Sequence, residues 1–238
     1  MSKTTQLPEL DDLATATSHV LETARGLSDA DLRAPSLCVG WTRGHVLTHL
    51  ARNADGLVNL LTWARTGVET PQYVSAETRD GDIEAGSGRP AAEVTADLAA
   101  ASDRLAQAIT QLPADRWDER VRMRSGREVT ASRIPWLRLR EVVIHHVDLD
   151  AGYTPAHWSP EFVERMLRGE ARRLSERADF PEVTLRDVDT HRVWSVGTDG
   201  PTVTGPSPAL LAWIIGRSPG DGLTVEPSGP LPTLPPWG

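Results

Sequence analysis

Four long segments between residues 10 and 149 carry apolar side chains at the three- and four-residue spacing of an amphipathic helix. Segment 42–66 has the longest stripe, and Thr42 is a residue type that caps helix starts. Pro90 suits the first turn of the third segment, and Pro113 stops it. The stripes consist of Leu13, Thr17, Val20, Leu21 and Ala24; Val46, Leu47, Leu50, Leu57, Leu60 and Leu61; Val94, Leu98, Leu105, Ile109 and Leu112; and Leu137, Val142 and Leu149. Because such stripes must be buried against one another, they predict a four-helix domain.

The chain changes character after Gly152, where long helices give way to short elements. One helix, capped by Ser159, is predicted to run to about Arg177. The later segments are β-rich runs at 183–185, 192–196 and 202–204, an apolar helix at 208–215 and a last strand at 223–226. The predicted fold class is therefore α+β, with a four-helix domain over residues 1–152 and a smaller α+β domain over residues 153–238.

Two connections within the first domain lack the helical period. Residues 73–89 contain Gly81, Gly86 and Gly88 among scattered charges, which predicts a long exposed loop, either a lid or a simple connector. Residues 117–123 and 127–130 flank Ser125-Gly126, which predicts a small hairpin or a turn.

Composition excludes several classes of protein. The 238 residues suffice for one large or two small domains, and 39% of them are hydrophobic, which is enough for a packed core. No apolar run approaches the ~20 residues that span a bilayer, and residues 1–6 do not resemble a secretory signal. We therefore expect a cytoplasmic protein without a membrane partner.

Charge and cysteine content narrow the possible ligands. The formal net charge of −8 disfavours nucleic acid, because phosphate binding requires a basic surface. Cys38 is the only cysteine, so neither an internal disulfide nor a cysteine-based zinc cluster can form. Any bound metal must be held by histidines and carboxylates.

Glu141 and His145 lie four residues apart on the fourth predicted helix, so their side chains share one face. His49 on the second helix is the best candidate for a third ligand, and His45 on the same face is an alternative. His146 points about a quarter turn away from His145 and is not expected to bind. Solvated or hydrogen-bonded side chains remain the alternative to a metal site, because spacing alone is a weak signal.

Two runs of sequence resemble a known family. They are Gly40-Trp41-Thr42-Arg43-Gly44-His45-Val46-Leu47-Thr48-His49-Leu50 and Arg140-Glu141-Val142-Val143-Ile144-His145-His146-Val147-Asp148-Leu149. Over nearly the whole chain the sequence resembles the mycothiol-dependent maleylpyruvate isomerases of the DinB-like metalloenzyme superfamily. The resemblance implies a DinB-like helical bundle that binds one divalent ion, zinc, through His49, Glu141 and His145.

The resemblance also implies a functional arginine near the end of an apolar helix in the second domain, and Arg217 follows such a run. A guanidinium group can hold a carboxylate through two parallel hydrogen bonds, which suits the implied dicarboxylate substrate. An ordinary surface role for Arg217 is the alternative, and Arg43 and Arg52 are further candidates for binding the substrate.

The implied activity is the cis–trans isomerisation of maleylpyruvate to fumarylpyruvate in gentisate-type aromatic degradation, by reversible addition of a thiolate. Cys38 has no neighbour in sequence that favours a thiolate, so an external thiol cofactor is expected. The resemblance implies that this thiol is mycothiol. The expected partners are the dicarboxylate and the small thiol, and a monomer is expected. The alternatives are a mycothiol S-transferase or metal-dependent hydrolase on the same scaffold, and a non-catalytic zinc-binding regulatory protein.

Overall fold

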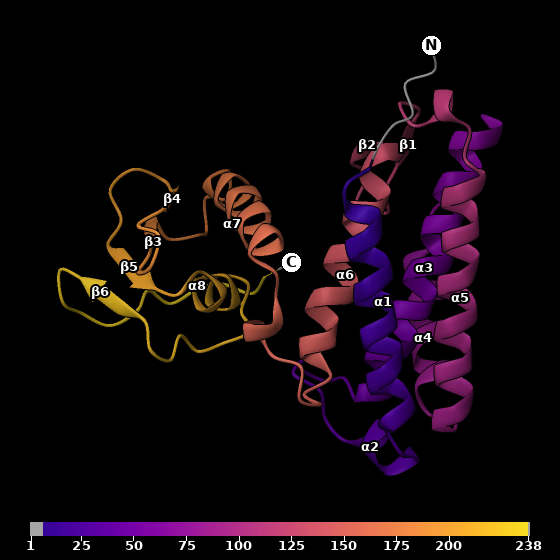
Figure 1. Ribbon diagram of the computed structural model, residues 1–238, viewed down its shortest axis with the longest axis horizontal. Helices are drawn as coiled ribbons and strands as arrows, with labels where there is room; N and C mark the ends of the chain where they lie inside the picture. The colour runs from indigo at the N-terminus through magenta and orange to yellow at the C-terminus, as the bar shows by residue number, and fades with distance from the viewer. Residues whose placement is uncertain (1–6, 238) are drawn as a thin grey trace. The chain divides into compact units, whose positions relative to one another are not determined.

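The computed structural model describes residues 7–237 and divides into two compact units between Ala151 and Gly152 (Figure 1). Residues 1–6, whose sequence does not resemble a secretory signal, and residue 238 lie outside the described part. The helices of the first unit are α1 (Glu9–Gly26), α2 (Asp29–Arg33), α3 (Arg43–Thr66), α4 (Ala76–Ser87), α5 (Ala91–Gln111) and α6 (Ile134–Asp148). Together with a second unit that contains a sheet, they confirm the predicted α+β class.

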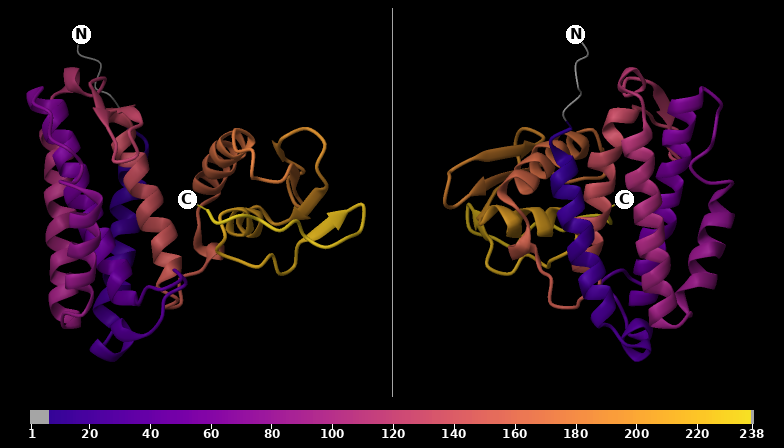
Figure 2. Two further views of the ribbon diagram at one scale, coloured as in Figure 1. Left: turned by 180° about the vertical axis from the view of Figure 1, so that it is seen from behind. Right: turned by 45° about the vertical axis from the view of Figure 1, so that its right-hand side comes forward.

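The long helices of the first unit pack side by side, and α3 contacts α4, α5 and α6 while α1 contacts α5 and α6 (Figure 2). The predicted apolar stripe of α3 lies at the centre of this arrangement, because Leu47, Leu50 and Leu60 are all completely buried. The predicted hairpin is formed by β1 (Arg120–Arg122) and β2 (Glu128–Thr130), which pair antiparallel.

Residues 73–89 do not form the predicted long loop, because most of them form helix α4. The hydroxyl of Ser75 accepts a hydrogen bond from Thr78 N–H and caps this helix. The glycines that indicated a loop include Gly86, where an added Cβ would lie 2.5 Å from Thr48 Cγ2. Gly44 lies on α3, and an added Cβ there would clash with the carbonyl oxygen of Ser87 on α4. Small residues therefore let α3 and α4 approach closely, and this packing outweighs the weak helix propensity of glycine.

The second unit has a mixed sheet covered by helices. Its elements are α7 (Pro160–Ser175), β3 (Val183–Asp187), β4 (Val193–Val196), β5 (Thr202–Gly205), α8 (Ser207–Ile214) and β6 (Thr224–Glu226). The strand order is β4-β3-β5-β6, with β3 and β5 parallel and the other pairs antiparallel. Helix α7 packs on β4 and α8 packs on β3 and β5, which buries Leu185 and Val203 completely.

Within residues 7–237, the helices are all too short or too polar to cross a lipid bilayer.

The close α3–α4 contact predicts that Gly44→Ala destabilises the protein, because the new methyl group would meet the Ser87 carbonyl. We expect a loss of about 1–3 kcal/mol in the free energy of unfolding, measured by urea denaturation. Gly81→Ala is the matched control, because no atom lies within 4 Å of its added Cβ and alanine favours a helix. Equal stability of both variants would contradict this account of the contact.

Candidate metal centre

The three side chains predicted as metal ligands lie together in the helical unit. His49 comes from the middle of α3, and Glu141 and His145 lie one turn apart on α6. His49 Nε2 is 2.9 Å from Glu141 Oε2, and His145 Nε2 is 3.6 Å from the same oxygen. One potential ligand atom from each residue lies within 4.8 Å of the other two. Side chains from two separate helices thus converge on one point.

The environment favours a neutral imidazole at His49 and an ionised carboxylate at Glu141. Burial lowers the pKa of His49 to about 4, although its hydrogen bond to Glu141 acts in the opposite direction. Burial raises the pKa of Glu141, but the hydrogen bond from His49 and the charge of Arg140 outweigh it and hold that pKa well below its usual value. At neutral pH the site therefore presents a neutral imidazole and a carboxylate.

Two imidazole nitrogens and one carboxylate oxygen are a donor set that suits zinc. Catalytic zinc sites typically have three protein ligands and keep a further position for water or substrate. The chain supplies such a set from facing helices, with side chains that are buried or partly buried. The residues present therefore fit the metal that the sequence resemblance implies.

The other candidate histidines make different contacts. His45 Nδ1 accepts a hydrogen bond from Thr42 N–H at the start of α3, and its Nε2 lies 3.1 Å from Glu84 Oε2. His146 is buried, and its Nε2 lies 2.7 Å from the hydroxyl of Thr23 on α1. Neither histidine belongs to the cluster of His49, Glu141 and His145.

A polar cavity of about 270 Å³ adjoins this cluster. His49 and Glu141 form part of its wall. Its other polar lining residues are Asn53, Gln72, Tyr73, Arg79, Arg124 and Ser125. With two arginines beside the histidine and the carboxylate, the cavity suits an anionic ligand.

Arg79, one of the lining residues, lies in direct contact with a candidate ligand. Its Nη2 lies 3.0 Å from His49 Nδ1, and its guanidinium carbon lies 5.8 Å from the centre of the Tyr73 ring. Since a guanidinium group only donates, His49 Nδ1 accepts this hydrogen bond and Nε2 carries the proton donated to Glu141. Arg79 was not predicted from the sequence, because its segment was expected to form a loop. The cap residue Ser75 was the available signal of a helix.

The three arginines that the sequence analysis named as candidates for binding the substrate make different contacts. Arg43 donates to the carbonyl oxygens of Leu149 and Asp150. Arg52 pairs with Asp55 and Asp97, as the 3.0 Å and 2.7 Å distances indicate, so both arginines are engaged by other parts of the helical unit. Arg217 lies in the second unit just after α8, where its Nη1 donates to Ile215 O and its guanidinium carbon lies 5.0 Å from the ring centre of Trp237.

The fold and the cluster define a two-domain α+β protein with a candidate metal centre beside a polar cavity of its helical domain. The family model described as the mycothiol maleylpyruvate isomerase N-terminal domain matches residues 13–150, and the model of the MDMPI C-terminal domain matches residues 154–236. The chain therefore belongs to the mycothiol maleylpyruvate isomerase family. This membership confirms the resemblance noted in the sequence.

Two solved structures of this family are also similar to the chain. A crystal structure of the mycothiol-dependent maleylpyruvate isomerase is 31% identical, with a TM-score of 0.90, and the match covers 97% of this chain and 96% of that one. A mutant of that isomerase with a histidine replaced by alanine is 30% identical, with the same TM-score and the same coverage. A search of curated proteins found no match.

The lowered pKa of His49 predicts a specific pH dependence of stability. Because its ordinary pKa of 6.5 exceeds the value of about 4 in the folded protein, the unfolded chain binds more protons between these limits. The free energy of unfolding should therefore fall as the pH is lowered from 6.5 to about 4, with up to ~3 kcal/mol from this residue. Urea denaturation in the presence of a chelator measures this free energy at each pH, and it should decrease less steeply in His49→Gln than in the wild type. An equal pH dependence in both proteins would contradict the assignment of the effect to His49.

Proposed function

We propose that the protein is a zinc- and mycothiol-dependent isomerase that converts maleylpyruvate to fumarylpyruvate in gentisate-type aromatic degradation. The observation that carries this proposal is the convergence of His49, Glu141 and His145 beside an arginine-lined cavity. Membership of the family and the activity named for its solved relatives support the choice of substrate and thiol.

In this proposal His49 and His145, through their Nε2 atoms, and the carboxylate of Glu141 would hold the metal. When bound, zinc supplies an electrophilic centre that lowers the pKa of a coordinated thiol, so that a thiolate is available at neutral pH. The protein contributes the neutral imidazole of His49 and the carboxylate of Glu141. Ligation through Nε2 of His49 would require the proton of the ring to move from Nε2 to Nδ1.

The isomerisation requires the cis double bond to become single for a short time. Addition of the mycothiol sulfur to one alkene carbon moves the electron pair of the double bond into the conjugated carbonyl group and forms an enolate. Rotation about the new single bond follows. Collapse of the enolate restores the double bond in the trans geometry and expels the thiolate, so no atom or electron is gained or lost.

The arginines of the chain are proposed to bind the substrate carboxylates and to stabilise the enolate. Arg79 and Arg124 line the cavity beside the candidate ligands, and Arg217 is implied by the family resemblance. With a metal held at His49 Nε2, the proton of the neutral ring would lie on Nδ1, which could no longer accept the hydrogen bond from Arg79. The guanidinium group of Arg79 would then be available to an anionic substrate.

The metal-ligand assignment predicts that His49→Ala loses both bound zinc and turnover. Zinc content is measured on the purified protein, and maleylpyruvate loss is followed by absorbance with and without mycothiol. His19→Ala is the matched control, because His19 is an exposed histidine of α1. Retention of zinc and activity by His49→Ala would rule out the proposed centre. Formation of a stable thioether by the wild type would indicate an S-transferase instead.

The substrate-binding roles predict that Arg79→Ala and Arg217→Ala keep zinc but lose activity. Removal of a charged hydrogen bond of about 1.5–3 kcal/mol corresponds to a decrease in kcat/KM of roughly 10- to 100-fold. Arg116→Ala provides a control, because Arg116 forms an exposed ion pair with Glu119 on the surface. Unchanged kinetics in either test variant would remove that arginine from the proposed site.

A further inference from the structure

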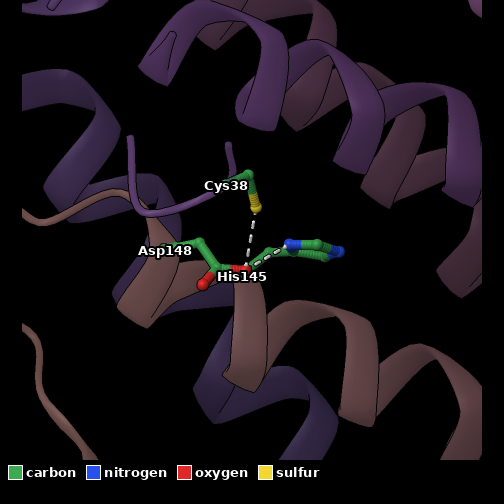
Figure 3. Close-up of side chains that lie close together, drawn as sticks. All are labelled: Cys38, His145 and Asp148. Carbon is green, nitrogen blue, oxygen red and sulfur yellow. Dashed lines mark hydrogen bonds and ion pairs between the residues drawn. The ribbon is translucent and has the colours of Figure 1, made fainter. Parts of the chain in front are cut away.

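A second cluster of side chains lies on the other side of His145. Asp148 is the last residue of α6, and its side chain is completely buried. Its Oδ2 lies 2.8 Å from His145 Nδ1 and 3.3 Å from Cys38 Sγ (Figure 3). One carboxylate oxygen therefore meets a ring nitrogen of its own helix and a thiol from the connection between α2 and α3.

This geometry determines which nitrogen of His145 carries the proton. Two potential donors, the imidazole and the thiol, converge on Asp148 Oδ2, and a carboxylate oxygen in contact with two donors acts as the acceptor. Nδ1 of His145 then donates to Asp148, and Nε2 keeps its lone pair. Nε2 is the nitrogen that lies 3.6 Å from Glu141 Oε2 in the candidate metal centre. The buried carboxylate thus presents the ring in the form that a metal ligand requires.

Backbone contacts hold Cys38 in place against Asp148. Leu37 N–H donates to the carbonyl oxygen of Asp148 at 2.9 Å, and Cys38 N–H donates to Ser36 Oγ at 3.1 Å. Trp41 N–H closes the turn by donating to Cys38 O at 3.0 Å. The thiol is therefore fixed as a hydrogen-bond donor to Asp148.

We propose that Asp148, supported by Cys38, is a positioning residue for His145. It holds Nδ1–H in a hydrogen bond and thereby aims Nε2 at the point shared with His49 and Glu141. This inference rests on the proposed metal centre. Outer carboxylates of this kind typically change metal affinity by about 10- to 100-fold when they are altered. Cys38 contributes less, because a thiol is a weak donor.

The test measures zinc affinity of the full-length protein by competition with a chromophoric chelator. Asp148→Asn should weaken zinc binding by about 10- to 100-fold, because the amide is uncharged and presents a donor as well as an acceptor. Asp150→Asn is the matched control, since it removes the same charge at an exposed position two residues away and should leave affinity unchanged. Equal affinities of Asp148→Asn and the control would overturn the proposal.

Cys38 variants test the thiol separately. Cys38→Ser should bind zinc within a few-fold of the wild type, because its hydroxyl also donates to Asp148. Cys38→Ala should bind more weakly than Cys38→Ser. A wild type that binds two zinc ions, one of which is lost in Cys38→Ala, would overturn the positioning role, because Cys38, His145 and Asp148 would then hold an ion themselves.

The tautomer of His145 provides a readout that does not depend on metal or on any variant. Nitrogen NMR of the chelator-treated wild type should show the proton of His145 on Nδ1, and a proton on Nε2 would overturn the proposal even if Asp148→Asn failed to fold. A wild type that binds no zinc but has the Nδ1–H form would instead refute the metal centre and leave the contact with Asp148 intact. The two failures are therefore distinguishable.

Discussion

The hydrogen bond between His49 and Glu141 joins α3 to α6 inside the helical unit, where polar groups are costly unless they are paired. Arg138 lies fully buried on the same helix as Glu141, and burial lowers its pKa to about 10. Its Nη1 donates to Leu50 O and to Asn53 Oδ1 on α3. The apolar stripes of the bundle therefore enclose a polar interface that packing alone does not explain. Such a departure from an apolar core is expected where a site carries function.

The parts that the sequence predicted well are those encoded by local interactions. Helix starts at Thr42 and Ser159 follow from side-chain caps, and the pairing of Glu141 with His145 follows from helical periodicity. The choice between His45 and His49 needed more than spacing, because both lie on one face of α3. The structure separates them, since the cap at Thr42 engages the ring nitrogen of His45. The family resemblance also implied His49 rather than His45, but it did not indicate the contact between His45 and Thr42.

The parts that the sequence did not predict depend on tertiary contacts. Helix α4 contains glycines that locally favour a loop, yet Gly86 is required by its contact with Thr48 on α3. Arg79 enters the cavity only because this segment is helical. The contact of Cys38 with Asp148 joins residues 110 positions apart, and no local pattern indicates it. Periodicity identifies the face of a helix, but the partner of that face is determined by the whole fold.

The two candidate imidazoles have opposite electrostatic surroundings, which gives them different properties as ligands. Asp148 accepts a hydrogen bond from Nδ1 of His145, which makes Nε2 of that ring a stronger electron donor. Arg79 donates to Nδ1 of His49, which withdraws electron density from that ring. A substrate carboxylate that binds Arg79 in the cavity would draw its guanidinium group away from His49 Nδ1, so that the hydrogen bond no longer weakens His49 as a ligand. Substrate binding and ligation by His49 should therefore favour one another, while the contact between Asp148 and His145 provides the constant part of the site.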